Sequence, residues 1–273
     1  MRQKLAIAKS WRALRTGIAF SVFGVGALML VTLAFPVVRL LSGTGEVRQQ
    51  RVQWLVHRTF QFFAWFMTVL GLIRVARVGM ERLRQSAPCL IVANHPTLID
   101  VVLLIAELPQ ADCVVKKGLW HNRFLRGVVA AAGYIPNDDG AALVGDCAQR
   151  LRAGRRLLLF PEGTRSPRGR LGHFRRGAAR IALESGCDVV PVVITCDPPT
   201  LAKGGKWYHV PDRPAHVTLE VQEPITMRRY LEPGTSPALA ARRLTEDLRI
   251  LYETKLGQCR PQTSAALTAA ASP

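Results

Sequence analysis

Residues 89–108 read CLIVANHPTLIDVVLLIAEL, and this stretch decides the fold. The apolar run at 89–93 has the length and continuity of a buried strand. A polar turn follows at 94–97, where Pro96 suits the start of a helix because its fixed φ matches the first helical turn. The apolar run at 98–108 then predicts that helix. We therefore expect a strand–turn–helix unit of an α/β protein.

The same alternation continues along the chain. Further apolar runs predict strands at 113–115, 157–160, 189–194 and 217–221, with helical patterns between and after them. This order predicts an α/β fold with a partly parallel sheet covered by helices, preceded by an N-terminal membrane-associated helical pair. The expected organisation is a membrane-associated segment at 1–78, a catalytic domain at 79–258 and a disordered tail at 259–273, which is rich in Ala, Ser and Thr.

The N-terminal segment carries the strongest membrane signal. Residues 16–38 have no formal charge, and as a helix they reach about 34 Å, enough for a hydrocarbon core of about 30 Å. A signal peptide also has a basic start and an apolar centre, but its apolar core is usually only about 7–15 residues long. No A-x-A cleavage site follows the run here. An uncleaved anchor is therefore predicted.

A second apolar stretch, residues 59–73, is rich in Phe and reaches only about 22 Å as a helix, which is short for a span. Aromatic rings favour the headgroup zone of a bilayer. The linker between the two stretches is rich in Arg, and positive loops stay on the cytoplasmic side. We expect a shallow hairpin or helical pair in one leaflet of the inner (plasma) membrane, with the catalytic domain on the cytoplasmic side.

The charge balance indicates a polyanionic partner. Lys and Arg number 37 against 19 Asp and Glu, which gives a net charge of +18. Nucleic acid and anionic lipid are the two usual partners of such a chain. The sequence has no nucleic-acid-binding motif, and its apolar segments favour anionic membrane lipids. The six cysteines lack C-x-x-C spacing, which predicts free thiols and no metal site.

His95 and Asp100 are the first candidate catalytic residues. His95 lies where the predicted strand ends, and Asp100 lies in the first turns of the following helix, where side chains lean back toward the N-terminus. A carboxylate there orients one imidazole nitrogen and leaves the other as a base. The alternative is a capping histidine and an aspartate that offsets the helix dipole. The H-x-x-x-x-D spacing alone does not decide between them.

The second candidate segment is LLLFPEGTRS at residues 157–166. A predicted strand delivers a polar turn in which Glu162 and Arg165 flank the flexible Gly163. Ligands of α/β sheets usually bind at such strand ends, and Arg165 with the arginines that follow it suits a phosphate. The alternative is a surface turn with a local Glu–Arg ion pair.

In this order the two segments resemble the glycerolipid acyltransferases of the 1-acylglycerol-3-phosphate acyltransferase type. The family block N-H-x-S/T-x-x-D matches residues 94–100, and the block F-P-E-G-T-R-S matches residues 160–166 without a change. A phenylalanine followed by basic residues and Gly-Ala matches residues 174–178, and the block V-x-P-V matches residues 189–192. The likeness covers about residues 75–225.

The resemblance implies a membrane-bound acyltransferase of phospholipid or other lipid biosynthesis. Such an enzyme moves a fatty acyl group from acyl-ACP or acyl-CoA to the hydroxyl of a lysophospholipid-like acceptor, such as 1-acylglycerol-3-phosphate, with no cofactor and no metal. Backbone N–H groups near Gly163 are expected to stabilise the oxyanion. The implied catalytic residues are His95 and Asp100, and the implied substrate-binding residues are Asn94, Thr97, Glu162, Gly163, Thr164, Arg165 and Arg176.

One departure from the family pattern concerns the acceptor. Residues 133–139 read GYIPNDD, and Asp139 stands where the family has an arginine thought to help hold the acceptor phosphate. A carboxylate repels a phosphate. A non-phospholipid acceptor, such as a pigment lipid or an amino lipid, therefore stays open. The sequence is also compatible with a thioesterase or a non-enzymatic membrane adaptor, although the chain lacks the G-x-S-x-G elbow typical of many hydrolases.

Overall fold

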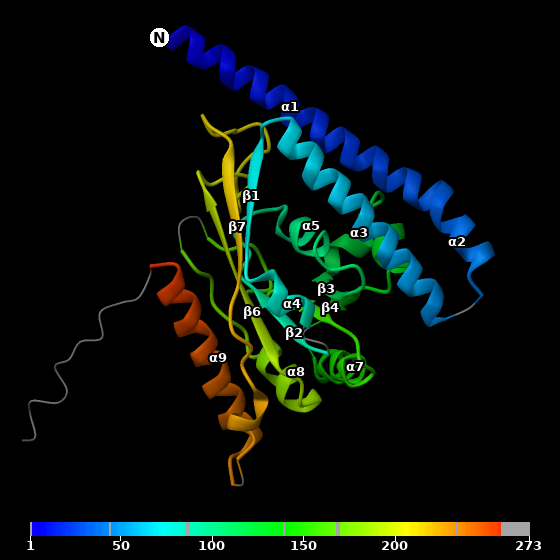
Figure 1. Cartoon of the computed structure of the whole chain (residues 1–273), viewed down its shortest axis with the longest axis vertical. Helices are drawn as coiled ribbons and strands as arrows, with labels where there is room; N and C mark the ends of the chain where they lie inside the picture. The colour runs from blue at the N-terminus through cyan, green and yellow to red at the C-terminus, as the bar shows by residue number, and fades with distance from the viewer. Residues whose placement is uncertain are drawn as a thin grey trace, which may run out of the picture.

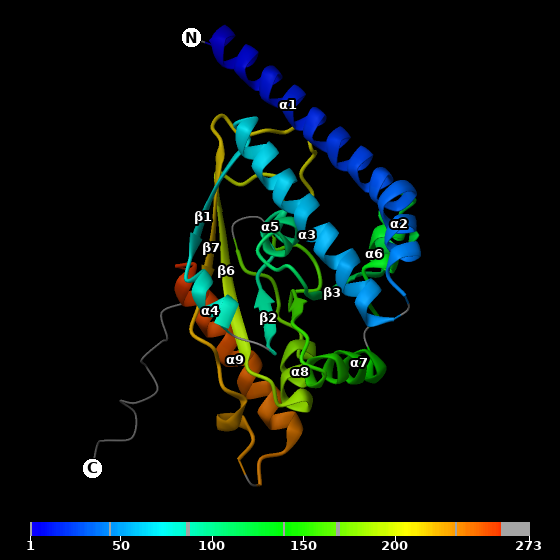
Figure 2. The same ribbon diagram turned by 45° about the vertical axis from the view of Figure 1, so that its right-hand side comes forward.

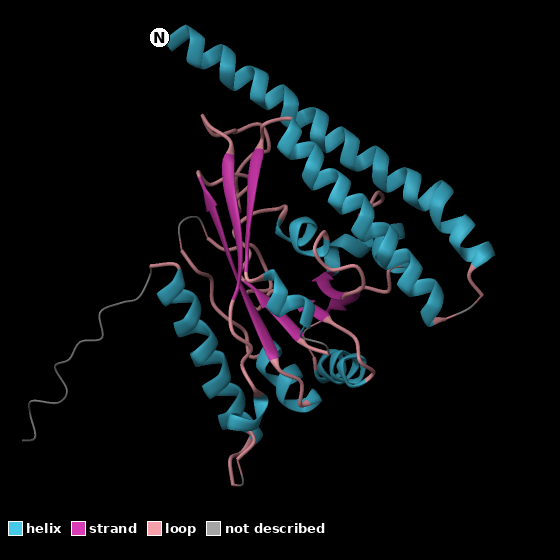
Figure 3. Cartoon of the chain, viewed as in Figure 1, coloured by secondary structure: helices cyan, strands magenta, loops and turns pink. Residues whose placement is uncertain are grey.

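The computed structural model describes residues 2–43, 45–85, 88–138, 140–167, 170–232 and 234–257. Within them a seven-stranded sheet has the order β1-β7-β6-β2-β5-β3-β4 (Figures 1 and 3). Strands β6 and β7 pair antiparallel, and the other neighbours pair parallel, which confirms the predicted α/β class. The strands are β1 (Ile73–Val78), β2 (Leu90–Ala93), β3 (Asp112–Lys116), β4 (Ile135–Asn137), β5 (Leu157–Leu159), β6 (Val189–Asp197) and β7 (Ala215–Val221).

The central strand β2 is buried on both faces. Ile91 and Ala93 belong to one apolar cluster, and Leu90 and Val92 belong to the other. Successive side chains of a strand point to opposite faces, so β2 contributes to both layers in turn. This burial explains why the strand reads as a continuous apolar run rather than as an alternating one.

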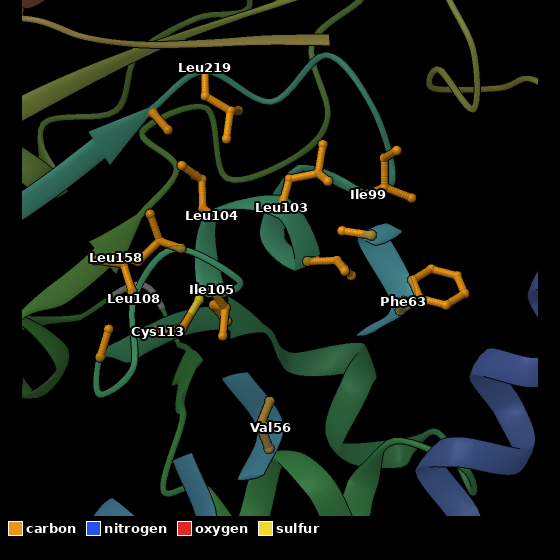
Figure 4. Packing of buried hydrophobic residues seen from close by; sticks show 14 of the residues in the cluster. Val56, Phe63, Ile99, Leu103, Leu104, Ile105, Leu108, Cys113, Leu158 and Leu219 are labelled. Atoms are coloured by element: carbon orange, nitrogen blue, oxygen red, sulfur yellow. The ribbon is translucent and has the colours of Figure 1, made fainter. Parts of the chain in front are cut away.

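Helices cover both faces of the sheet (Figure 2). One face carries α3 (Glu46–Val69), α5 (Asp100–Ile105) and α6 (Arg126–Ala131), and the other carries α7 (Ala141–Arg152), α8 (Gly177–Ser185) and α9 (Pro237–Lys255). Figure 4 shows Val56 and Phe63 of α3 in the same cluster as Leu103 and Ile105 of α5. Shorter helical segments are α4 (Met80–Gln85), η2 (Lys117–His121) and η3 (Met227–Tyr230).

The N-terminal helical pair is present. Helix α1 (Arg2–Met29) continues through a π-helical segment (Leu30–Ala34) into α2 (Phe35–Leu41), and α3 lies alongside it (Figures 1 and 2). In the described residues, Lys9–Leu41 is the one helix long and apolar enough to cross a membrane, with a mean hydropathy of 2.3. Helix α3 begins well before the predicted apolar stretch at 59–73 and is 24 residues long.

Two edge strands have no counterpart in the sequence prediction. Strand β1 pairs parallel with β7, so the sheet already begins in the part of the chain assigned to the membrane-associated segment. Strand β4 pairs with β3 at the other edge. Edge strands have one neighbour and expose more of their residues, so neither carries a continuous apolar run. The predicted tail at 259–273, and Asp139, lie outside the described residues.

Helix α9 is fastened to the strands that lead toward the candidate site. The buried Tyr252 hydroxyl donates to Val92 O at 2.6 Å and accepts from the Val192 N–H at 3.2 Å. Burial raises the pKa of Tyr252 well above its usual value, so the hydroxyl stays protonated as a donor. The start of α9 is fixed by Ser236, whose Oγ accepts from the Leu239 N–H.

Candidate active site

The turn after β2 brings His95 and Asp100 together. His95 Nδ1 lies 2.8 Å from Asp100 Oδ2. Asp100 is fully buried at the start of α5, and it also accepts from the N–H of Thr97 at 2.7 Å and from the Thr97 hydroxyl at 2.5 Å. Three hydrogen bonds therefore fix the carboxylate that orients the imidazole.

The other nitrogen of His95 is left for chemistry. A carboxylate accepts hydrogen bonds, so Nδ1 donates to Asp100 and Nε2 is the unprotonated nitrogen of the neutral ring. Within the described residues Nε2 makes no hydrogen bond. The ring stacks on Phe160 with centroids 4.3 Å apart, and its side chain is 15% exposed at the wall of a cavity. This arrangement places a base where a ligand can reach it.

Glu162 links the turn after β5 to the turn after β2 by hydrogen bonds. The buried Glu162 carboxylate accepts from the His95 N–H at 3.0 Å, from the Ser166 hydroxyl at 2.7 Å and from the Gly172 N–H at 2.8 Å. The Ser166 N–H in turn donates to His95 O at 2.7 Å. The two predicted segments, 67 residues apart at His95 and Glu162, therefore form one rigid unit.

Arg165 takes partners other than Glu162. Its Nη1 donates to Leu201 O at 2.8 Å and to Ala202 O at 3.2 Å, and the Leu98 N–H also donates to Leu201 O. Glu162 and Arg165, both in the described part of the chain, do not form the local ion pair considered from the sequence. The guanidinium instead fastens the segment after β6 to the site.

The predicted substrate-binding residues divide into two groups. The side chains of Asn94, Thr97 and Glu162 are buried and hydrogen-bonded inside the protein, Asn94 through a reciprocal pair of bonds with the backbone of Ile194 at 2.7 and 2.8 Å. These three residues do not line the cavity. The others do line it, namely Gly163, Thr164, Arg165 and Arg176.

A single large cavity contains His95. Its volume is about 1160 Å³, above the usual range of roughly 300–1,000 Å³ for a small-molecule site. Apolar residues of α1, α3, α5, α6 and the N-cap of α6 line one part, which we call the apolar arm: Phe20, Phe23, Gly24, Phe60, Val101, Val102, Leu125, Val128 and Val129. These helices and α8 lie on opposite faces of the sheet, so the cavity reaches across the sheet end at His95.

The remaining part of the cavity is positively charged. Its cations, called here the cationic lining, are Lys116, Arg165, Arg175, Arg176, Arg180 and Lys203, and no Asp or Glu is among the described residues around it. In the described structure the charged groups of Lys116, Arg176, Arg180 and Lys203 make no hydrogen bond or ion pair. Unpaired cations facing one cavity are suited to an anionic group of a ligand.

Several of these cavity residues are not identified by the sequence motifs. Arg180 lies on α8, four residues after Arg176 at the N-cap of that helix, and this spacing is a usable signal because such residues are neighbours on a helix. Lys203 lies in an irregular segment with no motif. The sequence pattern assigns Phe20 and Phe23 to the membrane anchor alone.

The backbone N–H groups near Gly163 differ in whether they already have an acceptor. Gly163 adopts a φ of 64°, and its N–H already donates to Phe160 O at 3.0 Å within the turn. The next N–H, that of Thr164, makes no hydrogen bond within the described residues, and Thr164 lines the cavity. The geometry therefore favours Thr164 over Gly163 as a backbone donor.

The described cysteines stand apart from this site. None of them lines the cavity. Burial raises the pKa of the Cys196 thiol to about 11, and the negative charge of Asp100 also raises it, so this thiol is protonated at neutral pH. The described residues contain no group of three or more His, Cys, Asp or Glu arranged to hold a metal ion.

Residues 74–195 match the family model described as Acyltransferase, and this range contains both turns of the site. Over this range the chain is similar to that family. It is 27% identical over 189 residues to a 1-acyl-sn-glycerol-3-phosphate acyltransferase of Pseudomonas aeruginosa, covering 66% of this chain and 70% of that protein. It is 33% identical over 123 residues to a chloroplastic enzyme of the same name from Brassica napus, covering 42% of this chain.

The match spans only 36% of the length of that Brassica napus relative. The fold has a counterpart in the crystal structure of the 1-acyl-sn-glycerophosphate (LPA) acyltransferase from Thermotoga maritima, with a TM-score of 0.70 and 19% identity. The likeness covers 94% of this chain and 99% of that one, so it includes the N-terminal helices as well as the sheet.

Proposed function

We propose that this acyltransferase moves a fatty acyl group from an acyl-ACP or acyl-CoA thioester to the hydroxyl of a lysophospholipid-like acceptor in a membrane. One observation carries the proposal. The His95–Asp100 pair presents Nε2 to a cavity that is apolar toward the N-terminal helices and cationic around α8. An amphiphile with a hydrocarbon chain and an anionic head matches both parts of that lining.

The reaction needs one base and no covalent enzyme intermediate. Nε2 of His95 takes the proton from the acceptor hydroxyl as its oxygen attacks the carbonyl carbon of the thioester. Asp100 stabilises the imidazolium that forms. When the tetrahedral intermediate collapses, the carbon–sulfur bond breaks and the imidazolium returns its proton to the leaving thiolate. The products are an ester and a free thiol.

Charge that develops during attack needs donors in the cavity. We assign the N–H of Thr164 to the oxyanion, because Thr164 lines the cavity, and one such donor is typically worth about 2.7–4 kcal/mol. Asn94, Thr97 and Glu162 act as positioning residues, because their side chains are buried and hold the two turns. Gly163, Arg165 and Arg176 keep the proposed role of forming the substrate site.

The cationic lining supports an acceptor with a phosphate, such as 1-acylglycerol-3-phosphate or a related lipid. Arg176 at the N-cap of α8 and Arg180 one turn further along the helix both line the cavity, as does Lys203 from the segment after β6. Asp139 removes one expected cation, but the unpaired cations around the cavity offset that loss. Curated relatives that act on this lipid, by name, support the same acceptor.

The N-terminal helix supports placement at the membrane. Exposed apolar side chains of α1 and the π-helical segment include Leu28, Met29 and Leu33, each more than half exposed. We propose that α1 is embedded in the inner (plasma) membrane, that anionic lipids attract the basic residues around it, and that the catalytic domain is cytoplasmic.

Replacing His95 by alanine tests the proposal. His95→Ala is expected to lower acyl transfer by about 10²–10⁴-fold, the usual contribution of a general base, with membrane binding unchanged. Transfer is measured as radiolabelled acyl groups that move from acyl-ACP or acyl-CoA to 1-acylglycerol-3-phosphate in vesicles. His216→Ala is the matched control, because His216 is exposed on β7 and does not line the cavity.

Each outcome of this assay has a defined meaning. Full activity in a folded His95→Ala protein would refute the assignment of the base. Release of free fatty acid by the native protein, without any ester product, would indicate a thioesterase. Unfolding of the variant is detected by circular dichroism, and in that case His95→Gln, which keeps a polar side chain of similar length, replaces it in the same measurement.

A further inference from the structure

The connection between β6 and β7, residues 198–214, carries an exposed pair of aromatic residues. Trp207 is 50% exposed and Tyr208 is 44% exposed, and their rings pack edge to face with centroids 5.6 Å apart. Neither side chain makes a hydrogen bond within the described residues. Trp and Tyr combine an apolar ring with a polar tip, so such a pair suits a partner that is apolar on one side and wet on the other.

This connection is packed against α1. The Trp207 ring lies 6.3 Å from the Phe20 ring, measured between centroids, at an interplanar angle of 67°. A Cβ added at Gly17 would lie 3.4 Å from the indole, so the glycine lets the ring approach the helix closely. Further along, Asp212 pairs with Lys9 at 2.8 Å. In Figures 1 and 2 the yellow connection reaches α1 beyond the end of the sheet.

The contacts with Trp207 fall where α1 changes in character. The helix is basic before residue 16 and has no formal charge from residue 16 to residue 38. Gly17 and Phe20 lie at the start of the uncharged run, so the indole packs at the boundary between the two parts. Trp and Tyr favour the headgroup zone, which borders the hydrocarbon core. The aromatic pair is therefore level with the headgroup zone that an embedded α1 defines.

The charge of the connection suits an anionic surface. Lys203 and Lys206 form no ion pair within the described residues, and the Lys206 ammonium lies 5.6 Å from the centre of the Tyr208 ring. Asp212 is the one acidic residue among positions 198–214, and Lys9 already pairs with it. Lysines next to an anionic bilayer are attracted to its surface. Two free cations beside an aromatic pair match such a surface in both charge and polarity.

The other end of the connection is fastened to the active site. Arg165 donates to Leu201 O at 2.8 Å and to Ala202 O at 3.2 Å, and Lys203 lines the cavity. Leu201 adopts a φ of 48°, a left-handed conformation that is unfavourable for a residue with a side chain. The contacts at both ends therefore hold the connection in one conformation, and a surface that is already ordered loses less entropy when it binds.

Resting on the proposed placement of α1 in the membrane, we infer that residues 203–209 form a second membrane-contacting surface of the protein. Trp207 and Tyr208 lie in the headgroup layer of an anionic bilayer, and Lys206 lies against the lipid phosphates. An acidic protein would match the lysines, but it would not account for an exposed aromatic pair at the polar–apolar boundary of α1. The surface also brings Lys203, and with it the cavity, next to the lipid headgroups.

Fluorescence quenching in vesicles tests the inference without turnover. The full-length protein is reconstituted, with neither donor nor acceptor, in vesicles of phosphatidylcholine and phosphatidylglycerol that carry bromine atoms near the top of the acyl chains. The signal of Trp207 is the difference between the native protein and Trp207→Phe. We expect this signal to lose about half or more of its intensity, because a ring in the headgroup layer lies next to those bromine atoms.

Two added tryptophans provide the controls. Leu239→Trp changes an exposed position of α9, which packs on the opposite face of the sheet from α1, and its added signal is expected to keep its intensity. Leu28→Trp changes an outward position of α1 and reports the insertion of that helix. Quenching in Leu28→Trp without quenching of Trp207 would overturn the inference and leave the placement of α1 intact. An absence of quenching at both positions would overturn the two together.

A charge reversal separates a bilayer from an acidic carrier protein as the partner. Lys206→Glu is expected to reduce the quenching of Trp207 in the anionic vesicles, whereas Arg243→Glu, at an exposed position of α9, is expected to leave it unchanged. The KM values for acyl-ACP and acyl-CoA are measured in the same variants. Reduced quenching with equal effects on both donors supports the inference. Unchanged quenching with a raised KM for acyl-ACP alone would assign the surface to the carrier protein and overturn it.

Discussion

Helices α1 and α3 lie side by side, but their polar residues have different partners. In α3 the buried Gln53 donates to Asp112 Oδ1 at 2.9 Å and to Ala132 O at 3.0 Å. His57 of α3 is also buried, and its Nδ1 lies 2.8 Å from Ile105 O. In α1, by contrast, Lys9 forms its ion pair with Asp212 at the surface, where both side chains are more than half exposed.

The comparison indicates that α3 is part of the folded domain, whereas α1 packs on its surface. A buried polar side chain is stable only when a partner inside the protein satisfies it, so Gln53 and His57 mark α3 as part of the domain. The N-terminal helix instead exposes apolar side chains on its outer face. Leu33 in the π-helical segment, for example, is 62% exposed. The length of an apolar run therefore says less about membrane insertion than the position of the polar residues within the helix.

The largest expected effect is the loss of Asp112, the fully buried carboxylate under α3. Asp112 accepts from Gln49, from Gln53 and twice from Arg155, with the Arg155 distances at 2.6 and 2.7 Å. Asp112→Ala removes the carboxylate that accepts from the Arg155 guanidinium and from the side-chain amides of Gln49 and Gln53. We therefore expect the free energy of unfolding to fall by about 3–5 kcal/mol. Urea denaturation in detergent measures it.

Asp212→Ala is the control for Asp112→Ala, because Asp212 pairs with a residue of α1. Asp212→Ala breaks only the exposed pair with Lys9, and solvent screening limits the expected loss to about 0–1 kcal/mol. Equal losses in the two variants would show that α1 and α3 are held to the domain in the same way.

A charge on the outer face of the N-terminal helix is expected to act on membrane binding instead of folding. Leu33→Lys places a cation in the uncharged run, which disfavours insertion by about 2.5–3.5 kcal/mol at the centre of a membrane helix. The free energy of unfolding in detergent is expected to change by no more than about 0.5 kcal/mol, as for other exposed sites. Vesicle flotation measures the partition.

Val47→Lys provides the matched change on α3. Val47 is 54% exposed in the polar first turns of that helix, and we expect the variant to float like the native protein. If Leu33→Lys floats like the native protein, the proposal that the N-terminal helix is embedded in the membrane would be contradicted.

The smallest expected effect concerns Cys113 on β3, beneath the contact with α3. Burial raises the pKa of this thiol to about 12, so only a minute fraction is thiolate at pH 8. Labelling by a disulfide reagent is therefore expected to be slow in the native protein and faster in Asp112→Ala, as mass spectrometry of the labelled peptide would reveal. Equal rates would mean that α3 does not shield β3.

The sequence predicts the centre of the molecule better than its edges. Strand β2 is recognisable because burial on both faces requires an unbroken apolar run, and the local spacing of His95 and Asp100 anticipates their contact. Strand β1 is missed because its exposed residues include arginines, and the pairing that makes it a strand comes from β7, far along the chain.

The partners of Glu162 and Arg165 are missed for a related reason. Local spacing leaves an ion pair between them open as an alternative, but Glu162 accepts from the remote His95 N–H, and Arg165 donates to carbonyls that follow β6. The part of α1 in the cavity is hidden likewise, since Phe20 and Phe23 read as anchor residues until the tertiary structure sets them beside Phe60. Contacts between distant segments carry no local pattern.

The way Glu162 is satisfied has a consequence for the arginines that follow it. Its carboxylate accepts hydrogen bonds from two backbone N–H groups and one hydroxyl, and a Cβ at Gly172 would collide with it, so this anion is shielded from solvent. Among the described residues, Glu162 thus holds the loop without forming an ion pair with Arg165 or Arg176. Arg176 and Arg180 have no counter-ion among the described residues and can therefore meet an anionic group that enters the cavity.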